Sequence, residues 1–171
     1  DNTSVVHNRI ELIKRAEYLW ERYNKSPLVI EQFIAGGEFT VPIIGNDSPE
    51  PLPVVQVAIC NKLDLGEMIY TFERIHSSEL RYVCPAKISK RLMEQLLDLA
   101  WRTHKAVGCL DFSRVDFRVD SNDNPFVLEI NPLPSLSRED VFDLAPRVAG
   151  YDFNTAVQKI INAGLKRLNL N

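Results

Sequence analysis

Side chains that could hold a metal ion are concentrated in one stretch, FSRVDFRVDSNDNPFVLEINPLPSL, which spans residues 112–136. The stretch predicts two strands around a turn centred in SNDN. This register places Asp116 opposite Glu129 and Arg114 opposite Asn131. Because side chains alternate between the two faces of a strand, these four residues share one face of the predicted hairpin.

The same register gives the predicted hairpin an apolar face opposite the charged one. Arg118 joins the charged face. A slip of one residue would mix the two sets, so the separation supports the register. The predicted apolar pairs are Val115 with Ile130, Phe117 with Leu128, and Val119 with Phe126.

Two interpretations of the charged face remain open from spacing alone. Directly opposed residues lie about 4.5–5.5 Å apart at Cβ, so Asp116 and Glu129 need positive charge between them. Arg114 and Arg118 could supply it, which would make this a solvated face with ion pairs each worth under about 1 kcal/mol. Alternatively, the two carboxylates and the Asn131 amide oxygen are hard ligands of the kind that Mg²⁺ takes near phosphates.

Helices and turn-connected strands alternate along the chain and must position these residues. Helical spacing, caps and β-branched runs define the elements. Strands joined by turns indicate an antiparallel sheet packed with helices, an α+β fold. The predicted elements are a helix over 9–23, a hairpin of 28–34 with 38–45, strands over 54–60 and 68–72, a surface loop over 73–81, a long helix from the Ser89 cap to Gly108, the charged hairpin, and a helix over 154–168.

Composition narrows the class of protein. With 171 residues, 45% of them hydrophobic, the chain can bury a core. A net charge of −3 without a basic stripe argues against nucleic acid as a partner. No apolar run approaches the roughly 20 residues that span a membrane. Three widely spaced cysteines fit neither a disulfide framework nor a metal pair, which predicts a reducing, cytoplasmic setting.

Several motifs occur in an order that is typical of a known family. VIEQFIAGGEFTV is followed by RYVCPA, a long helix, GCLDFSRVDFRVDSNDNPFVLEINPLPSL and AGYDF. Nearly the whole chain resembles the C-terminal part of an ATP-grasp ligase, within the D-alanine–D-alanine ligase group. The resemblance implies an ATP- and magnesium-dependent enzyme that joins a carboxylate to an amine through an acyl phosphate, with amino acids as the expected substrates.

The resemblance also assigns roles to individual residues. It implies Mg²⁺, or Mn²⁺ in its place, at Asp116, Glu129 and Asn131. It implies that Arg114 stabilises the transferring phosphate and the oxyanion of the tetrahedral intermediate. The remaining implied contacts are adenine at Glu31, Gln32, Phe33 and Ile34, the ribose hydroxyls at Glu38, and the γ-phosphate near Arg74.

Three positions depart from the family pattern. Ser135 occupies the place of a glycine in the turn after LEIN, and Ile75 that of a loop tyrosine. Asp140 occupies the place of the serine that binds the acceptor's carboxylate. An acid there would repel a carboxylate, so the identity of the acceptor stays open, with a cationic amine among the candidates.

The sequence lacks a phosphate loop of the Gly-rich kind, which brings bare backbone close to phosphates. It has only seven glycines. We therefore expect residues 1–171 to be the C-terminal part of an ATP-grasp domain, inactive without the N-terminal half of the same protein. A homodimer stays open, as does a rival hypothesis, a nucleotide-binding or interaction module of the same fold without turnover.

Overall fold

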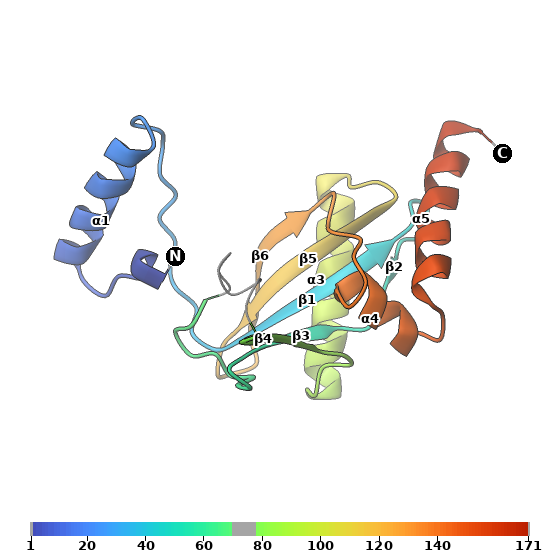
Figure 1. Cartoon of the computed structure of the whole chain (residues 1–171), viewed down its shortest axis with the longest axis horizontal. Coiled ribbons are helices and arrows are strands. Elements are labelled where there is room, and N and C mark those ends of the chain that lie inside the picture. Colours follow the sequence, from blue (N-terminus) through green and yellow to red (C-terminus); the bar gives the residue numbers. More distant parts are fainter. Residues whose placement is uncertain (1, 70–77, 171) are drawn as a thin grey trace.

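The protein is an α+β structure built on one antiparallel sheet (Figure 1). The computed structural model describes residues 2–69 and 78–170. The strands run in the order β4-β3-β1-β5-β6, with β2 paired to β1. Their bounds are β1 Gly37–Ile44, β2 Glu50–Pro51, β3 Val55–Ile59, β4 Leu80–Val83, β5 Phe112–Val119 and β6 Pro125–Asn131. The helices are the 3₁₀ turn η1 Asn2–Ser4, α1 Arg9–Arg22, α3 Lys90–Val107, α4 Val141–Val148 and α5 Phe153–Leu168.

Helix α3 covers one face of the sheet and forms the main core with it. The predicted caps explain its limits: the Ser89 side chain accepts from the Leu92 N–H, and Gly108 takes the left-handed conformation at φ 72°. The apolar side chains of β1 and β5 that alternate toward α3 are fully enclosed. This core contains Phe39, Val41, Ile43, Val115, Phe117 and Val119 from the strands and Leu92, Leu96 and Ala100 from α3.

Helices α4 and α5 cover one end of the opposite sheet face (Figure 1). There Phe112 meets Phe142 of α4 edge to face, with ring centroids 5.7 Å apart. Helix α4 was not predicted from the sequence because Pro146 lies inside it, and proline usually argues against a helix interior. The rest of this sheet face, between α4 and β6, carries the charged residues.

The prediction of two strands is wrong for the residues that the structure describes. Residues 28–34 are mostly apolar, but residues 26–35 form neither helix nor strand, because no neighbouring strand takes their backbone hydrogen bonds. Met68 and Ile69 also lie outside any strand, and 70–72 fall outside the described residues. The predicted surface loop over 73–81 is wrong at its end, where β4 begins at Leu80 and pairs with β3; 73–77 are not described.

The hairpin register is confirmed over its charged half and wrong beyond it. Arg114 pairs with Asn131 and Asp116 with Glu129, as predicted. The register then shifts, so Phe117 pairs with Val127 in place of Leu128, and Val119 pairs with Pro125 in place of Phe126. One extra residue, Leu128, is accommodated in β6 as a β-bulge.

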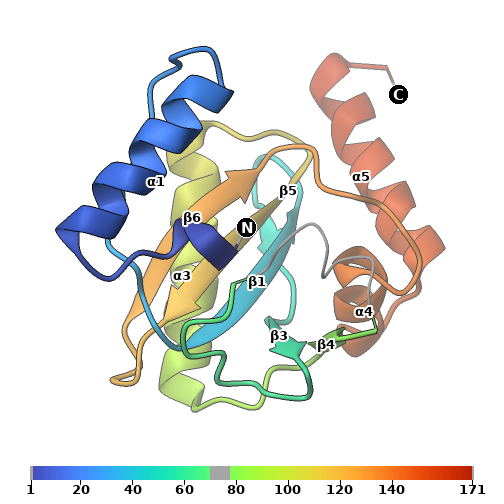
Figure 2. The ribbon, with the colours of Figure 1, turned by 60° about the vertical axis from the view of Figure 1, so that its left-hand side comes forward.

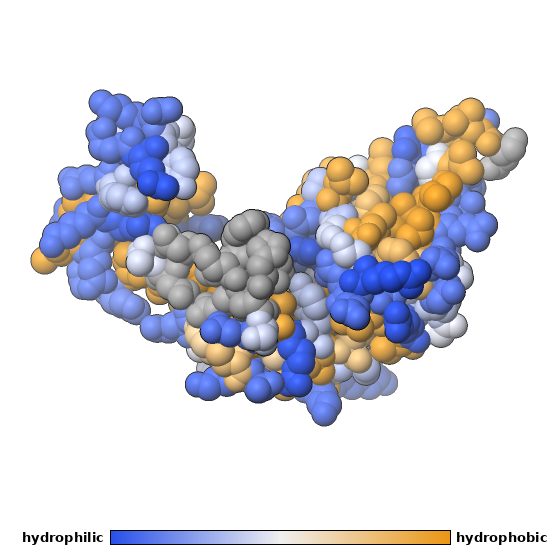
Figure 3. Space-filling view, viewed as in Figure 1, coloured by the Kyte–Doolittle hydropathy of each residue, from blue (hydrophilic) through white to orange (hydrophobic). Residues whose placement is uncertain are grey.

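Helix α1 stands apart from the sheet, at the end of the molecule away from α5 (Figures 1 and 2). Asn8 caps it and pairs with Glu11 as the sequence predicted. None of its residues is buried. The surface is hollowed between the α1 end and the α5 end (Figure 3). No helix in the described ranges has the length and apolar character to cross a membrane.

Candidate functional site

Three adjacent strands bring the charged residues into register on one face. The pairing of β1 with β5 places Thr40 opposite Asp116 and Glu38 opposite Arg118. The pairing of β5 with β6 places Glu129 on the other side of Asp116. Asp116 therefore lies at the centre of a row that runs across the sheet.

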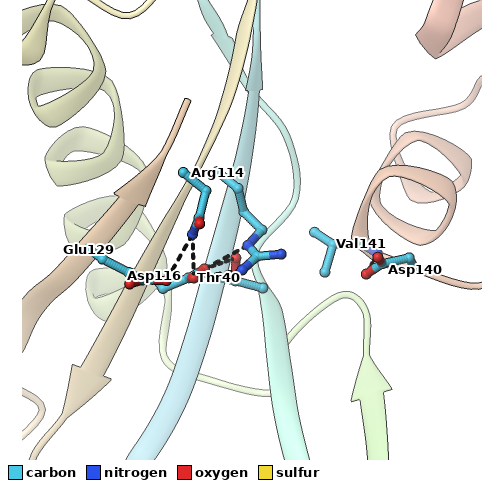
Figure 4. Close-up of polar contacts among 7 residues, drawn as sticks. Thr40, Arg114, Asp116, Glu129, Asp140 and Val141 are labelled. Atoms are coloured by element: carbon cyan, nitrogen blue, oxygen red, sulfur yellow. Dashed lines mark hydrogen bonds and ion pairs between the residues drawn. The ribbon is translucent and has the colours of Figure 1, made fainter. Parts of the chain in front are cut away.

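Hydrogen bonds from three neighbouring side chains hold the Asp116 carboxylate (Figure 4). Thr40 Oγ1 donates to Oδ1 at 2.6 Å. Arg114 binds both oxygens, with Nε donating to Oδ1 at 2.9 Å and Nη2 to Oδ2 at 2.8 Å. Asn131 Nδ2 donates to Oδ2 at 3.0 Å. These hydrogen bonds fix the orientation of the carboxylate.

The Asn131 amide links the two predicted metal-binding carboxylates. Its Nδ2 also donates to Glu129 Oε1 at 3.0 Å. A half-turn of this amide would present its carbonyl oxygen to the same space, giving two carboxylates and one amide oxygen. The described part of the chain contains no group of three or more His, Cys, Asp or Glu side chains that could hold a metal ion. A cation here would therefore depend on the amide oxygen as well as the acids.

The charge balance of this face suits a divalent cation. Glu38, Asp116 and Glu129 supply three carboxylates, whereas Arg114 and Arg118 supply two guanidinium groups. The donor set is made of the hard oxygen ligands that Mg²⁺ prefers. The residues present therefore fit the magnesium ion that the family resemblance implies.

Glu38 is the most perturbed acid of the site. Its side chain is 12% exposed, and burial raises its pKa to about 7. The Arg118 guanidinium opposes this rise in pKa, while the negative charges of Asp116 and Glu129 add to it. The charged form of Glu38 therefore depends on Arg118, whose Nη1 lies 3.3 Å from Glu38 Oε2.

A cavity of about 570 Å³ unites most of the predicted binding residues. Residues 31–34 form one wall, although they are not a strand. Val5, Val6 and Ile69 add apolar surface. The predicted site residues that line it are Glu31, Gln32, Phe33, Ile34, Glu38, Arg114, Asp116 and Glu129. Asn131 does not line the cavity but donates hydrogen bonds to Asp116 and Glu129, which do. Arg74 and Ile75 lie outside the described residues.

The start of α4 borders the other side of the charged row. A small hollow of about 20 Å³ lies between Val141 and Arg114 and is also lined by Thr40 and Asp116. Asp140 stands beside Val141 (Figure 4) and caps α4, because its Oδ1 accepts the Val141 N–H at 2.6 Å. The Asp140 carboxylate, which departs from the family pattern, is thus hydrogen-bonded to the N-terminus of α4.

The backbone of the turn after β6 is compatible with serine at position 135. Ser135 has a φ outside the positive range, so its side chain is compatible with the backbone conformation there. Its hydroxyl lies 2.9 Å from that of Ser137. The substitution of serine for the family's glycine therefore introduces no backbone strain.

Sequence reasoning missed two residues of the site. Thr40 was not singled out, although it lies two residues after Glu38 and so shares its face of β1. Arg118 was interpreted as a charge between Asp116 and Glu129, but it is 3% exposed and binds Glu38. Period-two spacing on β1 could have revealed Thr40. No sequence signal shows the burial of Arg118.

Comparison with known proteins identifies the family. A family model described as the D-ala D-ala ligase C-terminus matches residues 3–162. The chain belongs to this family. Its ATP-grasp fold, predicted from the motifs, is confirmed by this match and by the solved structures below.

Curated relatives align with nearly the whole chain. A D-alanine–D-alanine ligase of Pelotomaculum thermopropionicum is 31% identical over 170 residues, which is 96% of this chain and 51% of that protein. An uncharacterised protein, y4sG, of Sinorhizobium fredii is 33% identical over 95% of this chain and 48% of its own length. The chain spans about half the length of these relatives.

Solved structures of D-alanine–D-alanine ligases share the fold. The ligase from Bacillus anthracis, solved in complex with ATP, superposes with a TM-score of 0.73 at 24% identity, over 94% of this chain and 48% of that chain. The ligase from Coxiella burnetii gives a TM-score of 0.75 at 21% identity, over 95% and 40%. At these identities the likeness establishes the fold of the chain.

Proposed function

We propose that this chain is the C-terminal part of an ATP-dependent carboxylate–amine ligase that forms a peptide-type bond through an acyl phosphate. The observation that carries the proposal is the grouping of Arg114, Asp116, Glu129 and Asn131 beside the 570 Å³ cavity, in a chain of this family. A face that only needed solvation would not require two opposed carboxylates joined by one amide.

The residues that line the cavity favour one orientation of ATP, with adenine at residues 31–34 and the phosphates at Asp116 and Glu129. Residues 31–34 offer backbone groups free of sheet pairing for adenine, and Glu38 is placed to accept hydrogen bonds from the ribose hydroxyls. Asp116, Glu129 and Asn131 would hold Mg²⁺, or Mn²⁺ in its place. When bound, the metal ion would neutralise negative charge on the phosphates. The triphosphate would then lie over β5 and β6.

Arg114 is the proposed catalytic cation of this half. Its guanidinium already binds Asp116 through two nitrogens, and the same planar fork matches the oxygens of a phosphate or an oxyanion. Phosphoryl and acyl transfer of this kind depends on positioning and on stabilising charge more than on a protein nucleophile. Arg74 is proposed near the γ-phosphate from the family resemblance alone.

The proposed partners follow from the size of the relatives. The N-terminal half of the same protein would supply the Gly-rich phosphate loop and share the substrate surface. The substrates are proposed to be a small carboxylate and an amine, both amino acids. Asp140 leaves the charge of the acceptor open, because it precedes Val141, which lines the small hollow beside Arg114.

Turnover of ATP by the full-length protein tests the proposal. With Mg–ATP and a panel of amino acids that includes D-alanine, we expect release of ADP and phosphate. Asp116→Ala and Glu129→Ala should abolish this release. Asp98→Ala is the matched control, because Asp98 is an exposed acid of α3 that pairs with Arg102 away from the site. ATP binding without turnover across the whole panel would favour the module without catalysis.

A further inference from the structure

Arg118 makes contacts that link separate walls of the candidate nucleotide cavity. It lies on β5 two residues beyond Asp116, and only 3% of it is exposed. We infer that Arg118 is a positioning residue, which sets the shape of this cavity by fixing residues 31–34 against the loop that contains Gly66 and Met68. The inference rests on the proposed nucleotide-binding function.

Three backbone carbonyls accept hydrogen bonds from the Arg118 guanidinium. Nε donates to Ile34 O at 3.0 Å, Nη1 to Met68 O at 3.2 Å, and Nη2 to Gly66 O at 3.0 Å. None of these residues belongs to a strand, but the two segments already meet at Gly36, whose N–H donates to Gly66 O at 3.2 Å. The guanidinium extends this link to Ile34 and Met68.

Two side chains of the cavity also depend on Arg118. Its Nη1 lies 3.3 Å from Glu38 Oε2, and its Cζ lies 5.3 Å from the centre of the Phe33 ring. Glu38, Phe33 and Ile34 all line the cavity. The Arg118 guanidinium therefore orients both Glu38, which is proposed to bind the ribose, and residues 33 and 34, which are proposed to contact adenine.

Burial of Arg118 has a desolvation cost. A buried ion pair often contributes little net stability, because desolvation offsets the attraction between the charges. Here burial lowers the pKa of Arg118 and raises that of Glu38, so both partners experience that cost. Lysine would keep the charge but not the planar fork that reaches carbonyls on both segments.

Steady-state kinetics of the full-length protein test the inference. We expect Arg118→Met to raise the KM for ATP by about tenfold or more, equivalent to about 1.4 kcal/mol, and to change kcat by a smaller factor. Arg118→Lys should recover only part of the loss. Arg102→Met is the matched control, because Arg102 is an exposed arginine of α3 paired with Asp98.

Calorimetry separates positioning from simple loss of stability. Arg118→Met leaves Glu38 buried without its partner and should lower the free energy of unfolding, so Mg–ATP affinity is measured for the folded fraction of the variant. If Arg118 only stabilises the fold, this folded fraction will keep the wild-type affinity for Mg–ATP. That result overturns the inference. A wild-type protein that does not bind Mg–ATP would overturn the proposed function as well.

Discussion

At the scale of single residues, the Asp116 carboxylate is oriented by side chains from three strands. Thr40 donates the shortest of the hydrogen bonds to Asp116, at 2.6 Å, from the neighbouring strand. Asn131 joins Asp116 to Glu129. Because these contacts come from three strands, the orientation of Asp116 depends on sheet register as well as on its own sequence.

Glu38 makes stability depend on pH. Its pKa is about 7 in the folded protein, against 4.5 for an unperturbed glutamate. Between these values the folded state binds more protons than the unfolded state, so the free energy of unfolding falls as pH rises. We expect this contribution to reach roughly 3 kcal/mol at pH 8 relative to pH 4.

Urea denaturation of wild type and Glu38→Gln at several pH values measures this effect. Glutamine cannot titrate, so the difference in unfolding free energy between the two proteins should shift in favour of Glu38→Gln from pH 5 to pH 8. Arg118, Asp116 and Glu129 face Glu38 and are present in both proteins. A difference that stays constant with pH would show that the pKa of Glu38 is unperturbed.

At the scale of elements, the β-bulge in β6 shapes the cavity. Adjacent residues of a regular strand point to opposite faces, yet Leu128 and Glu129 both line the cavity. The extra residue at Leu128 allows this, because a bulge re-aims side chains. One strand therefore offers an apolar contact and a metal-binding acid to the same ligand.

Truncation of the bulged residue tests its contact with the nucleotide. We expect Leu128→Ala to weaken ATP binding several-fold, since loss of a partly buried apolar side chain costs about 1 kcal/mol. Val127→Ala is the matched control, because Val127 is similarly exposed on β6 but does not line the cavity. Equal affinities of the two variants, measured by calorimetry, would argue against a nucleotide contact at Leu128.

The sequence correctly predicted features that depend on residues close together in the chain. Ser89 and Gly108 mark α3 because capping depends on a few neighbouring residues. The register from Arg114 to Asp116 followed from alternation. The bulge at Leu128 escaped prediction because FVL in β6 has no alternation to reveal it. Residues 28–34 resembled a strand in composition, but a strand also needs a partner, which sequence alone does not provide.

At the scale of the whole molecule, residues 1–171 span about half the length of the curated relatives. We expect residues 1–171 alone to release no ADP from Mg–ATP, because the sequence contains no Gly-rich phosphate loop among its seven glycines. The full-length protein should turn over under the same conditions. ADP release by the isolated chain at a comparable rate would show that these residues suffice.

Helix α1 carries a tryptophan whose fluorescence would report contact with the proposed N-terminal half. It buries none of its residues, and Trp20 on it is 45% exposed. A surface that covers α1 would move this indole from water into an apolar environment and shift its fluorescence to shorter wavelengths. Residues 1–171 have one other tryptophan, Trp101 on α3, so Trp101→Phe would leave Trp20 as the sole tryptophan of this part of the protein.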